Sequence, residues 1–470
     1  MNKLATKIAA NERSDLAHLM RRAGFGTTPS ELDAFVVRGY EAVVEDILNP
    51  ETAPAFESDL IDRYFSGEPI YMSSGEWFFR MANSPRPLEE KIALFWHHVF
   101  ATGFSKSEHP PSMIRQIEMF RHFGLSDMRT ILVELAKDPA LIYWLDNNEN
   151  RREEPNENFG RELLELFSMG VGNYSEQDIK TASRAFTGWT FTQPLPVYPN
   201  GHFMTEFLYR DDDHDDSVNT FLNEEGQFTG EDIVDIIVKQ EATARFVCRH
   251  LYNFFVSDEP QVPAWGTTPP QDPEAVDTLV NAYFESSGEI RSILRVLFNS
   301  EFFKTSRFER IKSPAELVAG TIKLTGTHRF PSPQLLDLDT AATLMGQQLY
   351  NPPTVEGWHT GKEWIDGGAL NERVDFAVRE MANPSAPGIQ EIITDLRKDD
   401  EPLSPERFVE KSLDILGSLE VSSKTYAALL DCAKVSGGLD FNSEESINHG
   451  PESVHRMLQI IAASPEYQFA

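Results

Sequence analysis

Apolar residues recur every three or four positions along most of this chain, which is the period of amphipathic helices. Residues 88–99 are apolar nearly all round, and this pattern predicts a helix buried on most sides. Residues 234–255 form a long apolar-periodic run and predict a single long helix. Shorter runs predict further helices at residues 14–22, 317–324 and 340–349. The expected fold is therefore mainly α, a multi-helix globular fold.

Residues 187–232 interrupt the helical pattern. They are rich in Thr, Pro, Asp and Gly, and they contain short aromatic runs at residues 189–191 and 202–209. We expect a long irregular insertion here that can contain a β-hairpin. Long irregular segments in a compact domain tend to be functional, so this insertion is a place to look for a site.

A second change of composition lies nearer the end of the chain. Residues 384–404 carry Pro, Ser and many charges, and they are predicted to be a linker. The expected division is a helical core domain over residues 1–383, which includes the insertion, and a smaller helical region over residues 384–470 packed on it.

One local pattern recurs at residues 127–144, 289–304 and 453–469. Each copy has an apolar helical run, then Asp or Ser, then an aromatic residue. The Asp or Ser can cap a short following helix, and in two copies Pro follows at its first position. The copies lie about 160 residues apart, too far for a repeat array of short period. We therefore predict a shared helix–cap–short-helix element.

The charge balance limits the classes of partner. The 470 residues carry a formal net charge of -32, and nucleic acid or an anionic membrane surface would need clustered Lys and Arg instead. The two cysteines, Cys248 and Cys432, can form neither a disulfide framework nor a CxxC metal site. The N-terminus lacks the apolar core of a signal peptide, and no run approaches 18 apolar residues. These features predict a soluble, cytoplasmic chain.

The segment PNENFGRELLELFSMGVGNYSEQDI at residues 155–179 carries the most chemistry. On a helix from about Asn156, the residues Glu157, Arg161 and Glu165 form a stripe, and Glu162 lies between that stripe and the apolar face. One interpretation is an exposed row of ion pairs, worth only a few tenths of a kcal/mol each. The other is a buried cluster facing a cleft, where carboxylates act as acid, base or metal ligand. In that second case Glu157, Arg161 and Glu162 are the catalytic candidates.

Two further places could hold a divalent metal ion. His97 and His98 are neighbours on a predicted helix and diverge by about 100°, so at most one can be a ligand. The acidic run at residues 211–216 contains His214 and Asp215, although it lacks the glycine and terminal Glu of an EF-hand loop. The metal candidates are therefore His97, His214 and Asp215. The alternatives are a core histidine and a solvated acidic loop.

The last candidate site residues include aromatic residues in loops, which are expected to line a pocket. Trp189 and Trp358 lie in Gly- and Pro-containing loops, where tryptophans can line a pocket or cover a helix bundle. With Asn156 they are the expected pocket-lining residues. The sequence has no P-loop, no GxGxxG, no GxSxG and no HExxH, so nucleotide, dinucleotide, α/β-hydrolase and zincin functions lose support.

Several of these segments together resemble the large bacterial family known as domain of unknown function 1800. The resemblance is carried, in order, by HLMRRAGFGTTPSELDAF, EKIALFWHHVFATG, the 155–179 segment, RAFTGWTF, HDDSVNTFL, TARFVCRHLYNFFVSDEP and NPPTVEGW. Members of the family often carry a second histidine where this chain has Val99, and many are exported. The resemblance implies the family but no particular reaction.

Two functions remain open on these grounds. The first is a metal-assisted hydrolytic or oxidative enzyme that uses the His/Glu/Arg cluster. The second is a non-catalytic binding or scaffold protein, in which the Glu/Arg network is structural and the Trp-rich loops bind a protein, a glycan or a small molecule. The sequence does not indicate the oligomeric state.

Overall fold

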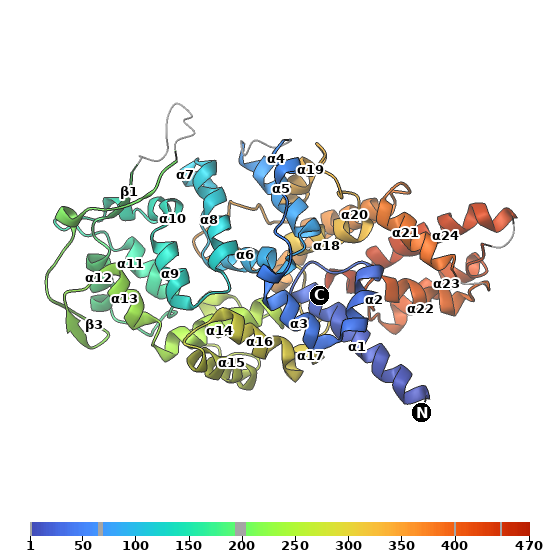
Figure 1. The fold of residues 1–470 in the computed structure, drawn as a ribbon, viewed down its shortest axis with the longest axis horizontal. Helices are drawn as coiled ribbons and strands as arrows, with labels where there is room; N and C mark the ends of the chain where they lie inside the picture. Colours follow the sequence, from blue (N-terminus) through green and yellow to red (C-terminus); the bar gives the residue numbers. More distant parts are fainter. Residues whose placement is uncertain (1, 64–68, 193–203, 399–400, 442–443) are drawn as a thin grey trace.

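The computed structural model describes residues 2–470 apart from 64–68, 193–203, 399–400 and 442–443, and it describes no side chains at 2–10 or 444–448. Helices dominate it, as the sequence predicted (Figure 1). The chain begins near the middle of an elongated molecule, builds one end, returns through the middle to build the other end, and its last residue lies back in the middle (Figure 1). Among the described residues, no helix is both long and apolar enough to span a membrane.

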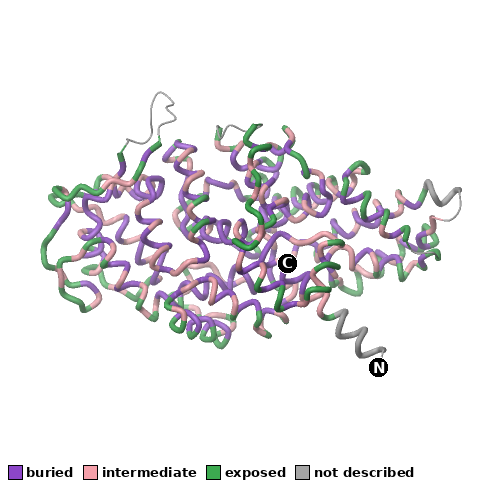
Figure 2. Tube along the Cα trace, viewed as in Figure 1, coloured by how far each residue is buried: buried purple, intermediate pink, exposed green. Residues whose placement is uncertain are grey.

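The first third of the chain forms the middle of the molecule and a portion of one end. Its α-helices are α1 (Asn2–Arg22), α2 (Pro29–Arg38), α3 (Tyr40–Leu48), α4 (Asp59–Asp62), α5 (Ile70–Asn83), α6 (Pro87–Val99), α7 (Phe104–Ser107), α8 (Pro110–Phe123), α9 (Met128–Ala136), α10 (Pro139–Trp144) and α11 (Asn158–Glu165). Helix α6 is buried on nearly every side, as its all-round apolar pattern predicted. It therefore belongs to the core around which the others pack (Figure 2).

The insertion contains two small antiparallel hairpins, so the expected hairpin is confirmed. Strand β1 (Trp189–Phe191) pairs with β2 (Phe207–Tyr209), and β3 (Asn219–Phe221) pairs with β4 (Glu224–Gly226). The β3–β4 turn uses Leu222 and Asn223, both with positive φ, as the commonest two-residue hairpin turns require. Two residues of the predicted aromatic run at 202–209, residues 202–203, lie outside the described residues.

The rest of the chain is again helical. Its α-helices are α12 (Glu176–Ala185), α13 (Gly230–Ile237), α14 (Glu241–Phe255), α15 (Pro273–Glu285), α16 (Ile290–Asn299), α17 (Glu301–Thr305), α18 (Pro314–Thr325), α19 (Leu335–Leu344), α20 (Gly367–Met381), α21 (Pro387–Leu396), α22 (Pro405–Ile415), α23 (Ser423–Val435) and α24 (Glu444–Ala462). Short 3-10 helices are η1 (Pro50–Thr52), η2 (Asn147–Glu149), η3 (Asp211–Asp213), η4 (Val262–Ala264), η5 (Gly361–Ile365) and η6 (Pro465–Gln468).

Three boundaries differ from those predicted. The expected single helix at 234–255 is two helices, because the hydroxyl of buried Thr243 donates to the carbonyl of Ile237 and closes α13 before α14 starts. The expected linker at 384–404 contains helix α21, which begins at Pro387 and buries an apolar face. The helix expected at 340–349 ends at Leu344, and Gly346 follows with a φ of 100°.

The recurring helix–cap–short-helix element is confirmed in the first two places, whereas in the third a short 3-10 helix follows but Ser464 makes no side-chain cap. Asp138 caps α10 and Ser300 caps α17 through their side chains, while Ser464 precedes η6. The first two copies also meet each other, since Asp127 and Glu289, the residues that precede α9 and α16, form an antiparallel bridge. The third copy joins the middle of the molecule through a bridge between Ile311 and Phe469. The division at residue 383 stays a prediction.

Candidate functional site

Helix α11 carries the charged segment that the sequence singled out. It begins at Asn158, two residues after the predicted start, and it buries Phe159, Leu163 and Leu164. Arg161 lies on its outer face, where it bonds Glu157 at 3.3 Å and Glu176, at the start of α12, at 3.0 Å. These side chains are partly or largely exposed. The Glu157–Arg161–Glu176 group is therefore a surface ion-pair network joining α11 to α12.

Glu162 is different from its neighbours. It is half-buried, and its carboxyl has neither a hydrogen bond nor an ion pair with any described residue. Burial, followed by the nearby negative charge of Glu165, raises its pKa to about 7, and the charge of Arg161 only partly opposes the shift. A carboxyl with this pKa is protonated about half the time near neutral pH, so it can both give and take a proton.

Two more carboxylates lie close to Glu162. Glu165 follows it by nearly one helical turn and accepts a hydrogen bond from the Tyr174 hydroxyl at 3.3 Å. Glu356 comes from the loop at 351–360, and its charge also raises the pKa of Glu162. Among the described residues, neither Glu165 nor Glu356 has a cationic partner within ion-pair distance. The site therefore concentrates negative charge without local neutralisation.

A cavity of about 490 Å³ is lined by two of these carboxylates, Glu165 and Glu356, whereas Glu162 lies next to them but is not among the lining residues. Glu165 and Glu356 line it together with the loop after α11, the outer face of α14 and the loop that follows α14. Phe246 and Trp265 supply an aromatic wall, with their ring centroids 5.7 Å apart. The cavity combines an apolar face with a few converging polar groups, as small-molecule sites usually do.

Gly170 is required where α11 runs into this wall. Its φ is 76°, and a Cβ built there would lie 2.9 Å from the ring of Phe246. Both the left-handed backbone and the close approach exclude a larger residue without strain. Gly170 therefore lets the chain turn against the pocket wall.

The arginines that line the cavity are already neutralised. Arg249 lies 4.5 Å from the Trp265 ring and bonds Glu259 at 2.7 Å, together with the carbonyls of Thr268 and Pro269. Arg245 pairs with Glu241 and Asp277. Arg249 thus holds the loop after α14 in place, and the uncompensated charge facing the cavity is that of the glutamates.

Two histidines lie near this region. His98 stacks on Trp358 with an interplanar angle of 13°, and His250 lies between Phe246 and Trp265 with both centroids 4.6 Å away. Burial lowers the pKa of His98 to about 4 and that of His250 to about 3. Nε2 of His250 is buried without a hydrogen-bond partner among the described residues. Both rings are therefore neutral at pH 7 and can serve as polar, uncharged groups.

His97, a predicted metal ligand, lies deeper in the core. Its Nε2 accepts the backbone N–H of Tyr350 at 3.0 Å, and its ring contacts Trp77 and Trp358. Burial, followed by the charge of His98, lowers its pKa to about 3. The ring is neutral and one nitrogen is committed to the backbone, as expected for a core histidine.

The other predicted metal ligands lie elsewhere. Nδ1 of His214 is 3.1 Å from the carbonyl of Thr187, and Asp215 pairs with Arg184 at 2.5 Å. Both hold the acidic loop against the end of α12, toward one end of the molecule, whereas α6 with His97 lies near its middle (Figure 1). The structure does not bring His97 and His214 together. Within the described ranges, no three His, Cys, Asp or Glu side chains are grouped so that they could hold a metal ion.

The predicted pocket-lining residues are structural contacts. Asn156 accepts from the N–H of Asn158 and donates its own N–H to Asn150, which shapes the loop before α11. Trp189 is buried between Phe186 and Phe207, and Trp358 is buried beside the two α6 histidines. None of the three is among the residues that line the 490 Å³ cavity.

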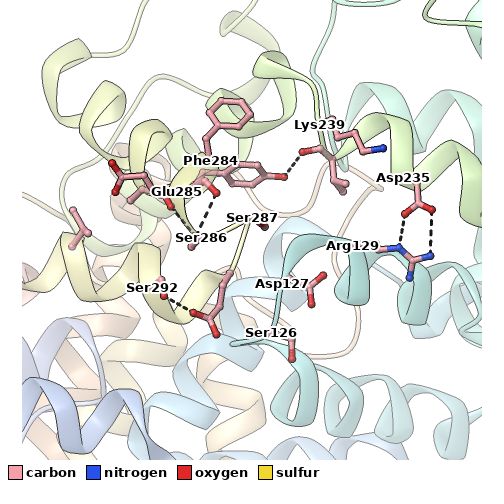
Figure 3. A pocket seen from close by; sticks show the side chains of 15 residues that line it. Ser126, Asp127, Arg129, Asp235, Lys239, Phe284, Glu285, Ser286, Ser287 and Ser292 are labelled. Carbon is pink, nitrogen blue, oxygen red and sulfur yellow. Dashed lines mark hydrogen bonds and ion pairs between the residues drawn. The ribbon is translucent and has the colours of Figure 1, made fainter. Parts of the chain in front are cut away.

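A larger cavity of about 1110 Å³ lies where α9, α13, α15 and α16 meet (Figure 3). Several of its polar groups are paired with one another: Arg129 bonds Asp235, and Ser292 donates to Glu289 (Figure 3). Asp127 caps α9. Because these groups are committed to the fold, we assign the candidate site to the smaller cavity beside Glu162.

Sequence reasoning found Glu162 but missed most of the residues around it. Glu356 and Trp265 come from loops more than 90 residues away from α11, and no periodicity connects them to it. His97 was preferred to His98, and adjacent positions in the sequence do not reveal that His97 is buried and His98 half-buried. The segment NPPTVEGW carried a signal for Glu356, the only acid in that run.

Comparison with protein-family models gives a match to the family described as Protein of unknown function (DUF1800), over residues 18–469. Searches of curated proteins and of solved structures found no match. The family match includes α11, α14 and the 351–360 loop, and therefore every element that builds the candidate site. Because it extends over nearly the whole chain, this protein belongs to the DUF1800 family.

Proposed function

We propose that this protein is a hydrolytic enzyme in which Glu162 is the general acid–base and a neighbouring carboxylate, Glu165 or Glu356, is its ionised partner. The observation that carries the proposal is the unpaired, half-buried Glu162 carboxyl, whose pKa is raised to about 7 beside the other two glutamates. A carboxyl with a raised pKa beside further carboxyls is a common arrangement for a general acid.

The chemistry follows from the two protonation states. Protonated Glu162 gives its proton to a leaving-group oxygen, while the ionised carboxylate attacks the reacting carbon or activates a water for that attack. Where the carboxylate attacks, water next displaces it from that carbon and gives its proton to Glu162. Where the carboxylate activates the water, it takes the water's proton, and Glu162 regains a proton from solvent. Glycosidic bonds are the substrate class that two carboxylates cleave in this way.

The cavity suits a neutral ligand with one apolar face. Phe246 and Trp265 offer an aromatic surface, and Glu165 and Glu356 offer hydrogen-bond acceptors. An anionic ligand would be repelled, because the lining arginines are paired with carboxylates of their own. A sugar, with hydroxyl groups around an apolar ring face, fits this combination.

The proposal gives no role to a metal ion. The predicted ligands His97, His214 and Asp215 each have other partners, and the cavity itself is lined by glutamates, aromatic residues and arginines with carboxylate partners. Metal assistance stays a prediction that elemental analysis of the purified chain tests. A stoichiometric ion whose removal by a chelator lowers the melting temperature would support it.

Hydrolysis of a panel of 4-nitrophenyl glycosides and esters tests the proposal. We expect turnover of at least one glycoside and a loss of about 100-fold or more in kcat for Glu162→Gln, which keeps the shape but removes the titrating proton. Glu157→Gln, on the same helix but in the surface ion-pair network, is the matched control and should keep kcat within about twofold.

No turnover of any glycoside, or equal rates for wild type and Glu162→Gln, would contradict the proposal. If no glycoside is turned over, the second candidate function is favoured, namely a binding protein whose cavity holds a sugar without cleaving it. The stacking of Arg249 on Trp265, which fixes an aromatic surface at the cavity, favours that candidate. Quenching of tryptophan fluorescence by unhydrolysed oligosaccharides, lost in Trp265→Ala, would distinguish it.

A further inference from the structure

The middle of this acidic molecule contains a concentration of positive charge, of which Arg21 and Lys312 are half-buried and the rest is buried. Six cationic side chains come together there from three helices and from the segment before α18: Arg21 and Arg22 of α1, Lys91 of α6, Arg310 and Lys312 before α18, and Arg373 of α20. Arg22, Lys91 and Arg373 have no exposed surface, and Arg310 has 2%. Burying so many like charges is costly unless anions compensate them.

Some of the charge is compensated within the fold. Glu316 accepts from Lys91 at 2.5 Å and from Arg310 at 2.6 Å, and Arg22 lies 3.6 Å from it. Arg22 and Arg310 also donate to the last carbonyls of α14, the negative end of that helix. These partners account for one half of the cluster, namely Arg22, Lys91 and Arg310.

The remaining three cations of the cluster have no carboxylate within ion-pair distance among the described residues. Arg21, Lys312 and Arg373 form no ion pair with any described residue and donate only to neutral groups. The Nε and Nη2 atoms of Arg21 and the Nη1 atom of Arg373 are buried without a hydrogen-bond partner among the described residues. Buried donors of a charged group are rarely left in this state.

Arg21 and Lys312 line a common cavity of about 60 Å³. Thr27, Thr321 and Tyr467 also belong to its wall, and so does Glu316, already neutralised by its three cations. Because about 10–15 Å³ of such space admits one water, the cavity has room for a few waters or one small polyatomic ion. It is far too small for a nucleotide or a sugar.

We propose that this cavity binds a small oxyanion, of the size of sulfate or inorganic phosphate, between the Arg21 guanidinium and the Lys312 ammonium. The guanidinium offers two free donors, which matches two oxygens of such an ion. The site lies apart from the glutamate cavity, so its ligand is a structural or regulatory anion and not the substrate of the proposed hydrolysis.

Binding should depend on pH through Lys312. Burial, then the charges of Arg21 and Arg373, lower the pKa of Lys312 to about 7, and Glu316 opposes them. The other groups facing it are Tyr467, whose carbonyl it bonds, and Lys91, whose pKa burial also lowers to about 7. An anion favours the charged ammonium, so affinity is greatest below pH 7 and falls as the pH rises through it.

Isothermal titration calorimetry of the full chain with sodium sulfate, in chloride buffers of matched ionic strength, tests the proposal. Sulfate does not titrate in this range, so its binding at pH 6 and pH 8.5 reports the protein alone. We expect one site per chain, about tenfold or more weaker binding in Arg21→Gln, and weaker binding at the higher pH. Arg407→Gln, which removes an exposed arginine of α22, should bind as wild type does.

Absence of saturable sulfate and phosphate binding to wild type would overturn the proposal, and would mean that groups within the chain balance the charge. Equal affinity in Arg21→Gln and wild type would also overturn it. If Arg21→Gln does not fold, Lys312→Gln replaces it, and that variant should in addition lose the pH dependence. Binding that is unchanged between pH 6 and pH 8.5 would remove Lys312 from the site.

Discussion

Glu162 and Glu90 show how much the environment decides what a buried glutamate does. Glu90 is fully buried, yet Arg121, Arg80 and the indole N–H of Trp77 all donate to it. Burial acts to raise its pKa, but the two arginines outweigh burial and lower it. Glu162 is less buried, but no described group donates to it, so burial, followed by the charges of Glu165 and Glu356, raises its pKa. Glu90 therefore stabilises the fold, whereas the carboxyl of Glu162 is available to exchange a proton.

Replacing Glu90 by Gln should lower the free energy of unfolding by about 3–5 kcal/mol, because Arg80 loses its carboxylate partner and buried Arg121 keeps only the exposed Glu118. Urea unfolding followed by circular dichroism measures this. Glu118→Gln is the matched control, since Glu118 is the exposed second partner of Arg121 and should cost under about 1 kcal/mol. Similar losses in both variants would contradict the assignment.

Glu162→Gln should instead stabilise the protein, and the gain should depend on pH. An acid with a raised pKa in the folded state costs stability once it ionises. That cost is absent well below its ordinary pKa of 4.5, grows through the interval up to about 7, and is complete above it. The melting temperature of Glu162→Gln should therefore exceed that of wild type at pH 8 and match it near pH 4. A gain that does not vary with pH, or a loss at pH 8, would be inconsistent with an unpaired acid.

At the scale of elements, local signals in the sequence set most of the helices. The start at 28–31 is a capping box between Thr28 and Glu31, and Ser175 with Asp178 forms another before α12. The apolar periodicity gave the wrong helix boundary where a tertiary contact determines it, as at Thr243 between α13 and α14. The linker prediction at 384–404 was also wrong, because Pro387 starts helix α21 there. The site was only partly predictable for the same reason: α11 could be placed from its pattern, but the loops that meet it could not.

The turn after α11 gives a prediction at this scale. Gly170→Ala should lower the free energy of unfolding by about 2–3 kcal/mol, since it adds both backbone strain and a clash with Phe246. Gly172→Ala is the control with the same kind of backbone, φ 92°, but with no atom within 4 Å of the added Cβ, so it should lose only about 1 kcal/mol. Chemical denaturation of both variants compares them, and equal losses would show that the pocket wall does not constrain the turn.

The whole molecule combines a strongly acidic composition with a cationic interior. The net charge of -32 disfavours anionic macromolecules at its surface, while the cluster around Arg21 and Lys312 is half-buried or buried in the fold. The last segment of the chain closes that region, because Phe469 bridges to Ile311 and Lys312 donates to the carbonyl of Tyr467. The smaller region predicted at 384–470 therefore contributes to the interior of the core domain predicted before it.

This closure predicts that the two regions unfold together. Differential scanning calorimetry of the full chain should show one transition, and a chain truncated after residue 383 should not unfold cooperatively, because it exposes the α18 and α20 surfaces covered by the C-terminal helices. Two separated transitions, or a stable truncated chain, would instead establish residues 1–383 as an independent domain.

The most direct test of the central claim is a difference proton titration of wild type and Glu162→Gln between pH 4 and pH 9. If Glu162 is the unpaired acid described above, wild type releases one additional proton with a midpoint near pH 7. A midpoint near 4.5, the ordinary value for glutamate, would mean that the carboxyl is ionised throughout the neutral range, and that Glu162 cannot be the acid of the proposed reaction.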